Sequence, residues 1–170
     1  MALIFSHDGI KDSLTQLAAP PLFYEELRRE LSRFERSGNP FSLVRLVLLT
    51  ETKNQYRQEN NDVSIYEVEI LNFAEILIRL SRSEDLCARI GEREFAILLH
   101  GSESVAQNLI ERVANKWLAA IAENVKERGR AYPDFLSAHL SSQSGENTLD
   151  LLNRLDRQPL IPFSCTFPGQ

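Results

Sequence analysis

Two short apolar runs around a glycine-containing turn constrain the fold of this chain most strongly. Residues 86–90 and 95–99 are rich in Leu, Ile, Ala and Phe, and the polar segment between them begins at Gly91. Runs of this length on either side of so short a turn predict a β-hairpin. An isolated hairpin is only marginally stable in water. The rest of the chain must therefore supply strands and helices that pack against it.

Helical and strand-like patterns alternate along the remaining sequence. Apolar residues at helical spacing predict helices over Phe23–Phe34, Ile70–Leu80, Val105–Ile121 and Thr148–Arg157, and apolar runs predict strands over Phe41–Leu49 and Phe135–Leu140. The polar, Asn- and Gln-rich segment 50–64 is predicted to be a loop that can include a short helical turn. The order is helix, strand, helix, strand, strand, helix, strand, helix. It predicts an α/β sandwich with a mixed sheet.

Composition narrows the class of protein without giving a function. The 170 residues are 43% hydrophobic and 25% charged, which suits one globular domain. A net charge of −5 argues against a DNA, RNA or anionic membrane surface as partner. The N-terminal apolar run is too short for a signal peptide, and no run approaches a membrane span. Cys87 and Cys165 lack metal-ligand spacing, so we expect a reduced, cytoplasmic protein without membrane insertion.

Residues of the hairpin carry a resemblance to a known family. The segment Cys87–Leu99, CARIGEREFAILL, resembles the signature hairpin of the GGDEF family of diguanylate cyclases, A-R-x-G-G-D-E-F-A-x-L-L. The segment Asp12–Leu17 resembles the opening D-x-L-T-G-L of that family, and the pair Leu22-Phe23 follows as it does there. The resemblance spans roughly residues 12–157 of a single domain, 1–170. It implies a palm-like α/β fold with a central, mainly antiparallel sheet, here as the C-terminal part of a longer signalling protein.

The turn of this hairpin departs from the family pattern. Active relatives join two GTP molecules into cyclic di-GMP by phosphoryl transfer, with Mg²⁺ held by carboxylates. The turn consists of Gly91, Glu92, Arg93, Glu94 and Phe95. A cation, Arg93, replaces the acidic third letter, and Glu92 replaces the second glycine.

The first strand departs from the pattern as well. It places Val47 and Leu49 where the family has its D-x-D pair. We therefore expect no catalytic residue, no bound Mg²⁺ and no cyclase activity. The alternative for Arg93 is a solvent-facing residue on the hairpin tip.

A second motif of the family is present upstream of the turn. Many relatives carry an inhibitory product site, R-x-x-D, five residues before the glycine pair. Here Arg82 and Asp85 are followed by five residues and then Gly91. An arginine can bond two guanine acceptors, and a carboxylate can accept from guanine N–H groups. Arg112, on the next predicted helix, is the candidate for the further arginine that relatives use. The alternative is an ordinary surface ion pair between residues i and i+3.

Two functions follow from these residues. The first is a receptor for cyclic di-GMP that lacks cyclase chemistry and signals to a protein partner or a neighbouring domain, as relatives do in exopolysaccharide or cellulose secretion. Ligand-linked homodimers also occur among relatives. The second is a dimerisation or docking module that binds no nucleotide. In a third option, GTP binds at the altered turn, with Arg93 on its phosphates.

Overall fold

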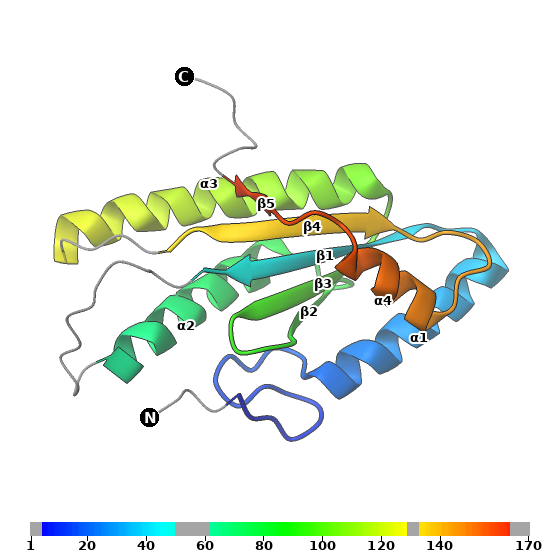
Figure 1. The fold of residues 1–170 in the computed structure, drawn as a ribbon, viewed down its shortest axis with the longest axis horizontal. Helices are drawn as coiled ribbons and strands as arrows, with labels where there is room; N and C mark the ends of the chain where they lie inside the picture. The colour runs from blue at the N-terminus through cyan, green and yellow to red at the C-terminus, as the bar shows by residue number, and fades with distance from the viewer. Residues whose placement is uncertain (1–4, 50–61, 129–132, 164–170) are drawn as a thin grey trace.

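The helices and strands follow the predicted order, with one additional strand. The protein is described from a computed structural model that places residues 5–49, 62–128 and 133–163. Its elements are α1 (Pro20–Ser37), β1 (Phe41–Leu48), α2 (Asp62–Leu80), β2 (Leu86–Arg89), β3 (Glu94–His100), α3 (Glu103–Arg128), β4 (Phe135–Ser141), α4 (Thr148–Asp156) and β5 (Ile161–Pro162) (Figure 1). The predicted hairpin is β2 and β3. Residues 50–61 of the predicted loop lie outside the described residues.

The five strands form one sheet with the order β2-β3-β1-β4-β5, and every neighbouring pair is antiparallel. The mixed sheet predicted from periodicity is therefore wrong, and the mainly antiparallel sheet implied by the resemblance is confirmed. The reason is that the two helical crossovers interleave. The crossover through α2 joins β1 to β2 with β3 between them, and the crossover through α3 joins β3 to β4 with β1 between them. Strands that run parallel are thus never neighbours.

Helices cover both faces of this sheet. Helices α2 and α3 pack on one face, and α1 and α4 pack on the other (Figure 1). Alternation along β1 makes this possible, because Val44, Leu46 and Leu48 enter the α2–α3 core while Phe41 and Leu43 enter the α1–α4 core. The central strand therefore contributes side chains to two hydrophobic cores.

An aromatic cluster anchors the α2–α3 core. The ring of Phe73 lies 5.2 Å from Phe95, 5.0 Å from Trp117 and 5.3 Å from Phe135, measured between centroids. Trp117 is fully buried, and its indole N–H donates to the carbonyl of Pro133 at 2.9 Å. Because Phe95 belongs to the predicted turn motif, this cluster fixes one end of the hairpin in the core.

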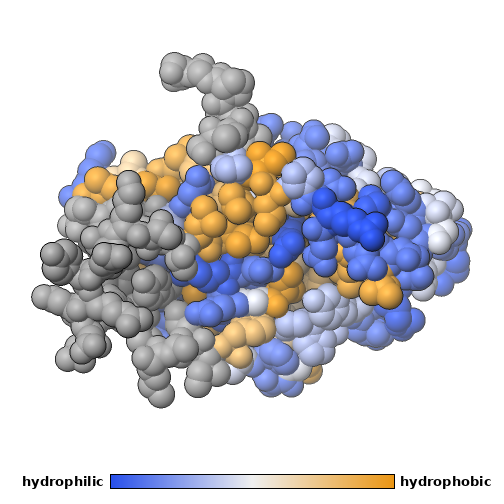
Figure 2. All heavy atoms as spheres, in the orientation of Figure 1, coloured by the Kyte–Doolittle hydropathy of each residue, from blue (hydrophilic) through white to orange (hydrophobic). Residues whose placement is uncertain are grey.

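Part of the sheet on the α1–α4 side is covered by none of the described helices. Figure 2 shows apolar surface on this face, beside the region that α1 and α4 cover. Val47 and Leu136, opposite each other in the register of β1 and β4, are both half-buried. Among the described residues, no helix is long and apolar enough to cross a membrane.

Candidate functional site

The two sequence motifs meet in a buried ion pair. The guanidinium of Arg89 donates to both carboxylate oxygens of Asp12, at 3.0 and 3.2 Å, and the two side chains are 1% and 0% exposed. Arg89 also donates to the carbonyl of Glu92 at 3.2 and 2.7 Å. Thr15 donates to Asp12 through its backbone N–H and its hydroxyl. These bonds hold the N-terminal loop against the hairpin and fix the shape of the turn.

The turn itself places its five residues in different surroundings. Phe95 is fully buried, Glu92 is exposed, and Glu94 accepts a hydrogen bond from Arg45 at 3.1 Å. A Cβ added at Gly91 would lie 3.3 Å from Cβ of Glu94, so a larger residue there would press on the facing strand. The backbone N–H of Gly91 closes the turn by donating to the carbonyl of Glu94.

Arg93 points into the protein, so its interpretation as a solvent-facing residue on the hairpin tip is wrong. Its side chain is 12% exposed. The guanidinium donates to the carbonyls of Leu48 and Leu49, at 3.0 and 2.8 Å, and pairs with the buried carboxylate of Glu69 at 3.2 Å. The physical reason is that the last residues of β1 and the adjoining turn of α2 present oxygen atoms here, and a five-donor guanidinium can satisfy several of them.

The same place is where the resemblance implies a magnesium ion. Mg²⁺ prefers carboxylate and carbonyl oxygens in octahedral geometry. Here the carbonyls of Leu48 and Leu49 already accept hydrogen bonds from a cationic side chain. Among the described residues, no three His, Cys, Asp or Glu side chains are grouped so as to hold a metal ion. The residues at this position therefore do not fit Mg²⁺.

The turn after α2 holds Arg82 and Asp85 without an ion pair between their side chains. The carboxylate of Asp85 accepts hydrogen bonds from the backbone N–H of Arg82 at 2.9 Å and of His100 at 3.4 Å. The backbone N–H of Asp85 donates to the carbonyl of Arg82 at 3.2 Å. The exposed guanidinium of Arg82 contacts no carboxylate or carbonyl among the described residues within bonding distance. The carboxylate is thus oriented by backbone groups, and the guanidinium is available.

Arg112 comes from α3 to the same place. A depression of about 70 Å³ is lined by Leu80, Arg82, Asp85, Leu99, Val105, Asn108, Leu109 and Arg112. The side chain of Arg112 is exposed and makes no ion pair with the part of the chain that the structure describes. The structure therefore brings the three predicted ligand-binding residues around one depression with a mixed polar and apolar lining.

A thiol lies beside this turn but has little reactivity. Burial raises the pKa of Cys87 to about 11, and the hydroxyl of Ser81 lies 3.0 Å from its sulfur. At neutral pH the group is therefore a protonated thiol, which is a poor nucleophile and metal ligand.

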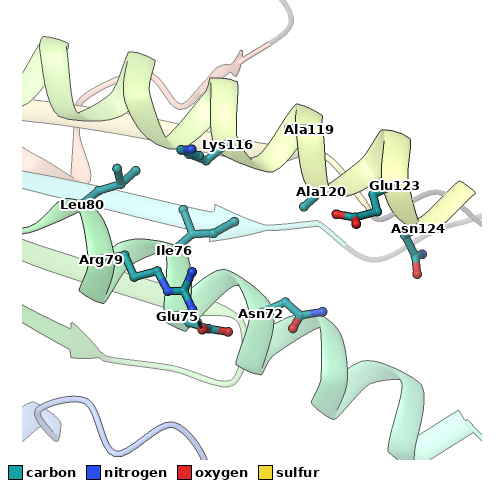
Figure 3. A pocket seen from close by; sticks show the side chains of 10 residues that line it. All are labelled: Asn72, Glu75, Ile76, Arg79, Leu80, Lys116, Ala119, Ala120, Glu123 and Asn124. Carbon is teal, nitrogen blue, oxygen red and sulfur yellow. Dashed lines mark hydrogen bonds and ion pairs between the residues drawn. The ribbon is translucent and has the colours of Figure 1, made fainter.

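Larger cavities lie elsewhere in the described part of the chain, and two of them bear on function. One, of about 550 Å³, is a groove between α2 and α3, with Ile76, Leu80, Ala119 and Ala120 along it and charged side chains around them (Figure 3). The other, of about 310 Å³, lies between the N-terminal loop and the Arg82–Asp85 turn. Each draws its residues from segments far apart in the sequence. Arg82 and Asp85 line the second cavity, and the other lining residues belong to no predicted site.

Comparison with known proteins identifies the family. The family model described as "Diguanylate cyclase, GGDEF domain" matches residues 10–158. A search among curated proteins found no match.

Solved structures show the same fold. The GGDEF domain of DgcB from Caulobacter crescentus in complex with c-di-GMP has a TM-score of 0.64 at 19% identity, covering 92% of this chain and 88% of that one. Diguanylate cyclase SiaD in complex with its activator SiaC, from Pseudomonas aeruginosa, has a TM-score of 0.68 at 24% identity, covering 86% and 55%. The FimX GGDEF domain from the same organism has a TM-score of 0.61 at 22% identity, covering 87% and 90%. The family model spans both sequence motifs, and the antiparallel sheet has the order described above. This chain therefore belongs to the GGDEF-domain family of diguanylate cyclases.

Proposed function

We propose that this domain is a receptor for cyclic di-GMP, that it binds the messenger through Arg82, Asp85 and Arg112, and that it has no cyclase activity. The observation that carries the proposal is that these three side chains, from a turn and from α3, line one depression. Both guanidinium groups are exposed. They can therefore move onto a ligand without breaking an ion pair to a described residue.

The chemistry of the depression suits a guanine. A guanidinium can donate to O6 and N7 of the base, and a carboxylate can accept from its N1–H and exocyclic amine. Asp85 keeps this capacity, because a carboxylate offers about four acceptor sites and two backbone N–H groups use only part of them. The volume of about 70 Å³ is small, so the base would lie at the mouth of the depression and Arg112 would close over it.

Residues of the hairpin turn support the absence of cyclase chemistry. The guanidinium of Arg93 is bonded to the end of β1 and to Glu69, so it is not available to a phosphate. The exposed carboxylate of Glu92 would repel a nucleotide triphosphate. Together they argue against a catalytic residue or a Mg²⁺ ion at this turn, and they also weaken the option that GTP binds there.

Relatives support the kind of ligand and partner. DgcB was solved with c-di-GMP, and SiaD was solved with its activator protein. We propose that messenger binding in a cytoplasmic protein biases a protein partner or an upstream signalling domain, for example in exopolysaccharide or cellulose secretion. A ligand does so only if it binds one state more tightly than another. Ligand-linked dimerisation belongs to the same proposal, and a nucleic acid partner does not.

Calorimetric titration of site variants tests the binding residues. We expect Arg82→Ala, Asp85→Asn and Arg112→Ala each to weaken cyclic di-GMP binding at least tenfold, because each removes a charge-assisted hydrogen bond. Arg79→Ala, which removes an exposed arginine on α2, is the matched control and should bind normally. Equal affinity for all four variants and the wild type would refute the assignment of the site.

A turnover assay tests the absence of cyclase activity separately. The protein is incubated with GTP and Mg²⁺ or Mn²⁺, and cyclic di-GMP is measured by chromatography. We expect no product above that of a sample without protein. Product that accumulates in proportion to protein concentration would show that the turn is catalytic.

The groove between α2 and α3 favours a second candidate, a docking module that binds no nucleotide. The ion pair of Glu75 with Arg79, at 2.5 Å, lies on one side of the groove, and Lys116 and Glu123 lie on the other (Figure 3). An apolar floor between charged rims is typical of a surface that receives a partner helix. If Arg82→Ala leaves partner binding unchanged with and without cyclic di-GMP, this candidate is favoured over the receptor.

A further inference from the structure

A second cavity borders the Arg82–Asp85 turn. It has a volume of about 310 Å³, and its walls come from the N-terminal loop, the first turn of α1, the end of α2 and β2. Arg82 and Asp85 line both this cavity and the small depression that contains Arg112. The turn therefore borders two cavities, and Arg112 lines only the smaller one.

The N-terminal loop is held firmly enough to serve as a wall. Ala18 donates its backbone N–H to the carbonyl of Cys87 at 3.0 Å and accepts from the N–H of Arg89 at 3.0 Å, which attaches the loop to β2. The buried pair of Asp12 with Arg89 adds a second attachment. Asp12 is the neighbour of Lys11 in the sequence, and the backbone N–H of Lys11 itself donates to the carboxylate of Asp8 at 2.7 Å. The backbone that carries Lys11 is thus fixed before any ligand arrives.

The walls of this cavity combine apolar surface with two cations that form no ion pair to a described residue. Ile10 on the loop and Ile78 on α2 are 60% and 53% exposed, so both present apolar surface at this cavity. The exposed ammonium of Lys11 makes no ion pair within residues 5–49, 62–128 and 133–163, and Arg82 is equally available. Asp85 is the acidic group on the lining.

These features match one class of ligand. A purine nucleotide offers flat apolar faces, which aliphatic side chains can cover, and anionic phosphates, which a lysine binds as a point charge. Cyclic di-GMP has two guanines and two phosphates, so a site that contacts one guanine leaves a phosphate and a base to be accommodated next to it. The cavity that begins at the same Arg82–Asp85 turn is placed to receive them.

We infer that Lys11 is a ligand-binding residue of this domain, and that the cavity between the N-terminal loop and the Arg82–Asp85 turn holds the part of cyclic di-GMP that the Arg112 side does not. This role rests on the proposed function. Lys11 supplies a cation to a phosphate, while Arg82 and Asp85 recognise a base. The loop that opens the domain thereby becomes part of the messenger site.

Calorimetric titration with cyclic di-GMP tests the role of Lys11. We expect Lys11→Ala to weaken binding about tenfold, because one charge-assisted contact to a phosphate is lost. Its affinity should also fall less steeply than that of the wild type between about 50 and 500 mM salt, because one screened attraction is missing. Lys11→Arg should retain most of the affinity. Lys116→Ala, an exposed lysine in the α2–α3 groove, is the matched control and should bind as the wild type does.

The outcomes separate this inference from the proposed function. If the wild type binds, Arg82→Ala does not, and Lys11→Ala binds as the wild type does, the role of Lys11 is refuted and the receptor function stands. If the wild type shows no binding, both are refuted. Lys11 is exposed, so its variants should retain the thermal melting temperature of the wild type, and a circular dichroism melt checks this.

Discussion

At the scale of single residues, Arg93 holds the hairpin turn against the end of β1 and against α2. Its guanidinium joins the carbonyls at the end of β1 to the carboxylate of Glu69 on α2. A divalent ion held there by carboxylates would neutralise negative charge in the same region. In this chain the positive charge at that position comes from Arg93, whose guanidinium is always protonated.

Replacing Arg93 should therefore destabilise the fold. We expect Arg93→Gln to lower the free energy of unfolding by about 2–4 kcal/mol, because hydrogen bonds to two carbonyls and a buried ion pair are lost together. Glu92→Gln, at the exposed neighbouring position, should change it by less than about 0.5 kcal/mol. Urea unfolding followed by circular dichroism measures both. Equal stability of the two variants would contradict the role assigned to Arg93.

The surroundings of Arg82 and Asp85 could be predicted from the sequence, whereas those of Arg93 could not, and the reason is physical. The fixed spacing between Arg82, Asp85 and Gly91 is local, and the structure places Arg82 and Asp85 in one turn close to the hairpin. The partners of Arg93 lie 44 and 45 positions away in the chain. No pattern within the hairpin sequence shows that those carbonyls will lie next to Arg93. The expectation that its side chain faces solvent is therefore wrong.

At the scale of elements, α4 depends on its first turn. The side chain of Asn147 accepts from the backbone N–H of Asp150 at 3.0 Å, and the carboxylate of Asp150 accepts from the backbone N–H of Asn147 at 3.4 Å. This reciprocal capping satisfies two N–H groups that the helix cannot bond internally. It matters in a helix of nine residues, which has little intrinsic stability.

Removal of the cap should cost a measurable part of the stability. We expect Asn147→Ala to lower the free energy of unfolding by about 1 kcal/mol. Asn153→Ala, at an exposed position inside α4, should be neutral or slightly stabilising, because alanine has the higher helix propensity. Thermal melts of the two variants make the comparison. A larger loss for Asn153→Ala than for Asn147→Ala would contradict the capping account.

Elements differ in how well the sequence predicts them. The capped helix α4 and the apolar strand β1 were predicted nearly to their ends, because caps and apolar runs are local signals. The strand β5, two residues long, was missed, since it is too short to show any periodicity. Helix α2 begins at Asp62, inside a segment predicted to be a loop, and α3 runs from Glu103 to Arg128, beyond its predicted ends. The ends of a helix often contain few apolar residues, so helical periodicity does not show where the helix begins or ends.

At the scale of the whole molecule, Arg154 connects helix α4 to the end of strand β4 and to the loop between them. Arg154 on α4 donates to both carboxylate oxygens of Glu146, at 2.6 and 2.8 Å, and to the carbonyl of Ser141 at the end of β4 at 2.7 Å. Hydrogen bonds from Arg154 hold the pKa of Glu146 below its ordinary value of 4.5. Because the native state favours the ionised carboxylate, this contact stabilises the fold fully above about pH 4.5 and loses its effect as the pH falls through the native pKa.

The pH dependence of unfolding checks this contribution. We expect Glu146→Gln to be about 1 kcal/mol less stable than the wild type at pH 7, and the difference to shrink as the pH is lowered below 4.5. Glu111→Gln, at an exposed position on α3, should show no such difference at any pH. Urea unfolding between about pH 3 and pH 7 measures it. A deficit for Glu146→Gln that stays constant over this range would contradict the linkage.

The central claim is that a GGDEF fold serves here as a receptor with its site at the Arg82–Asp85 turn. The most direct measurement is a calorimetric titration of cyclic di-GMP into the wild-type protein, repeated in excess GTP and with Arg82→Ala. The account predicts saturable binding in the micromolar range, unchanged by GTP and lost in the variant. No binding at about 100 μM, which limits the binding free energy to about −5.5 kcal/mol, would contradict the receptor function. Binding that GTP abolishes would contradict the proposed site, because the ligand would then lie at the hairpin turn.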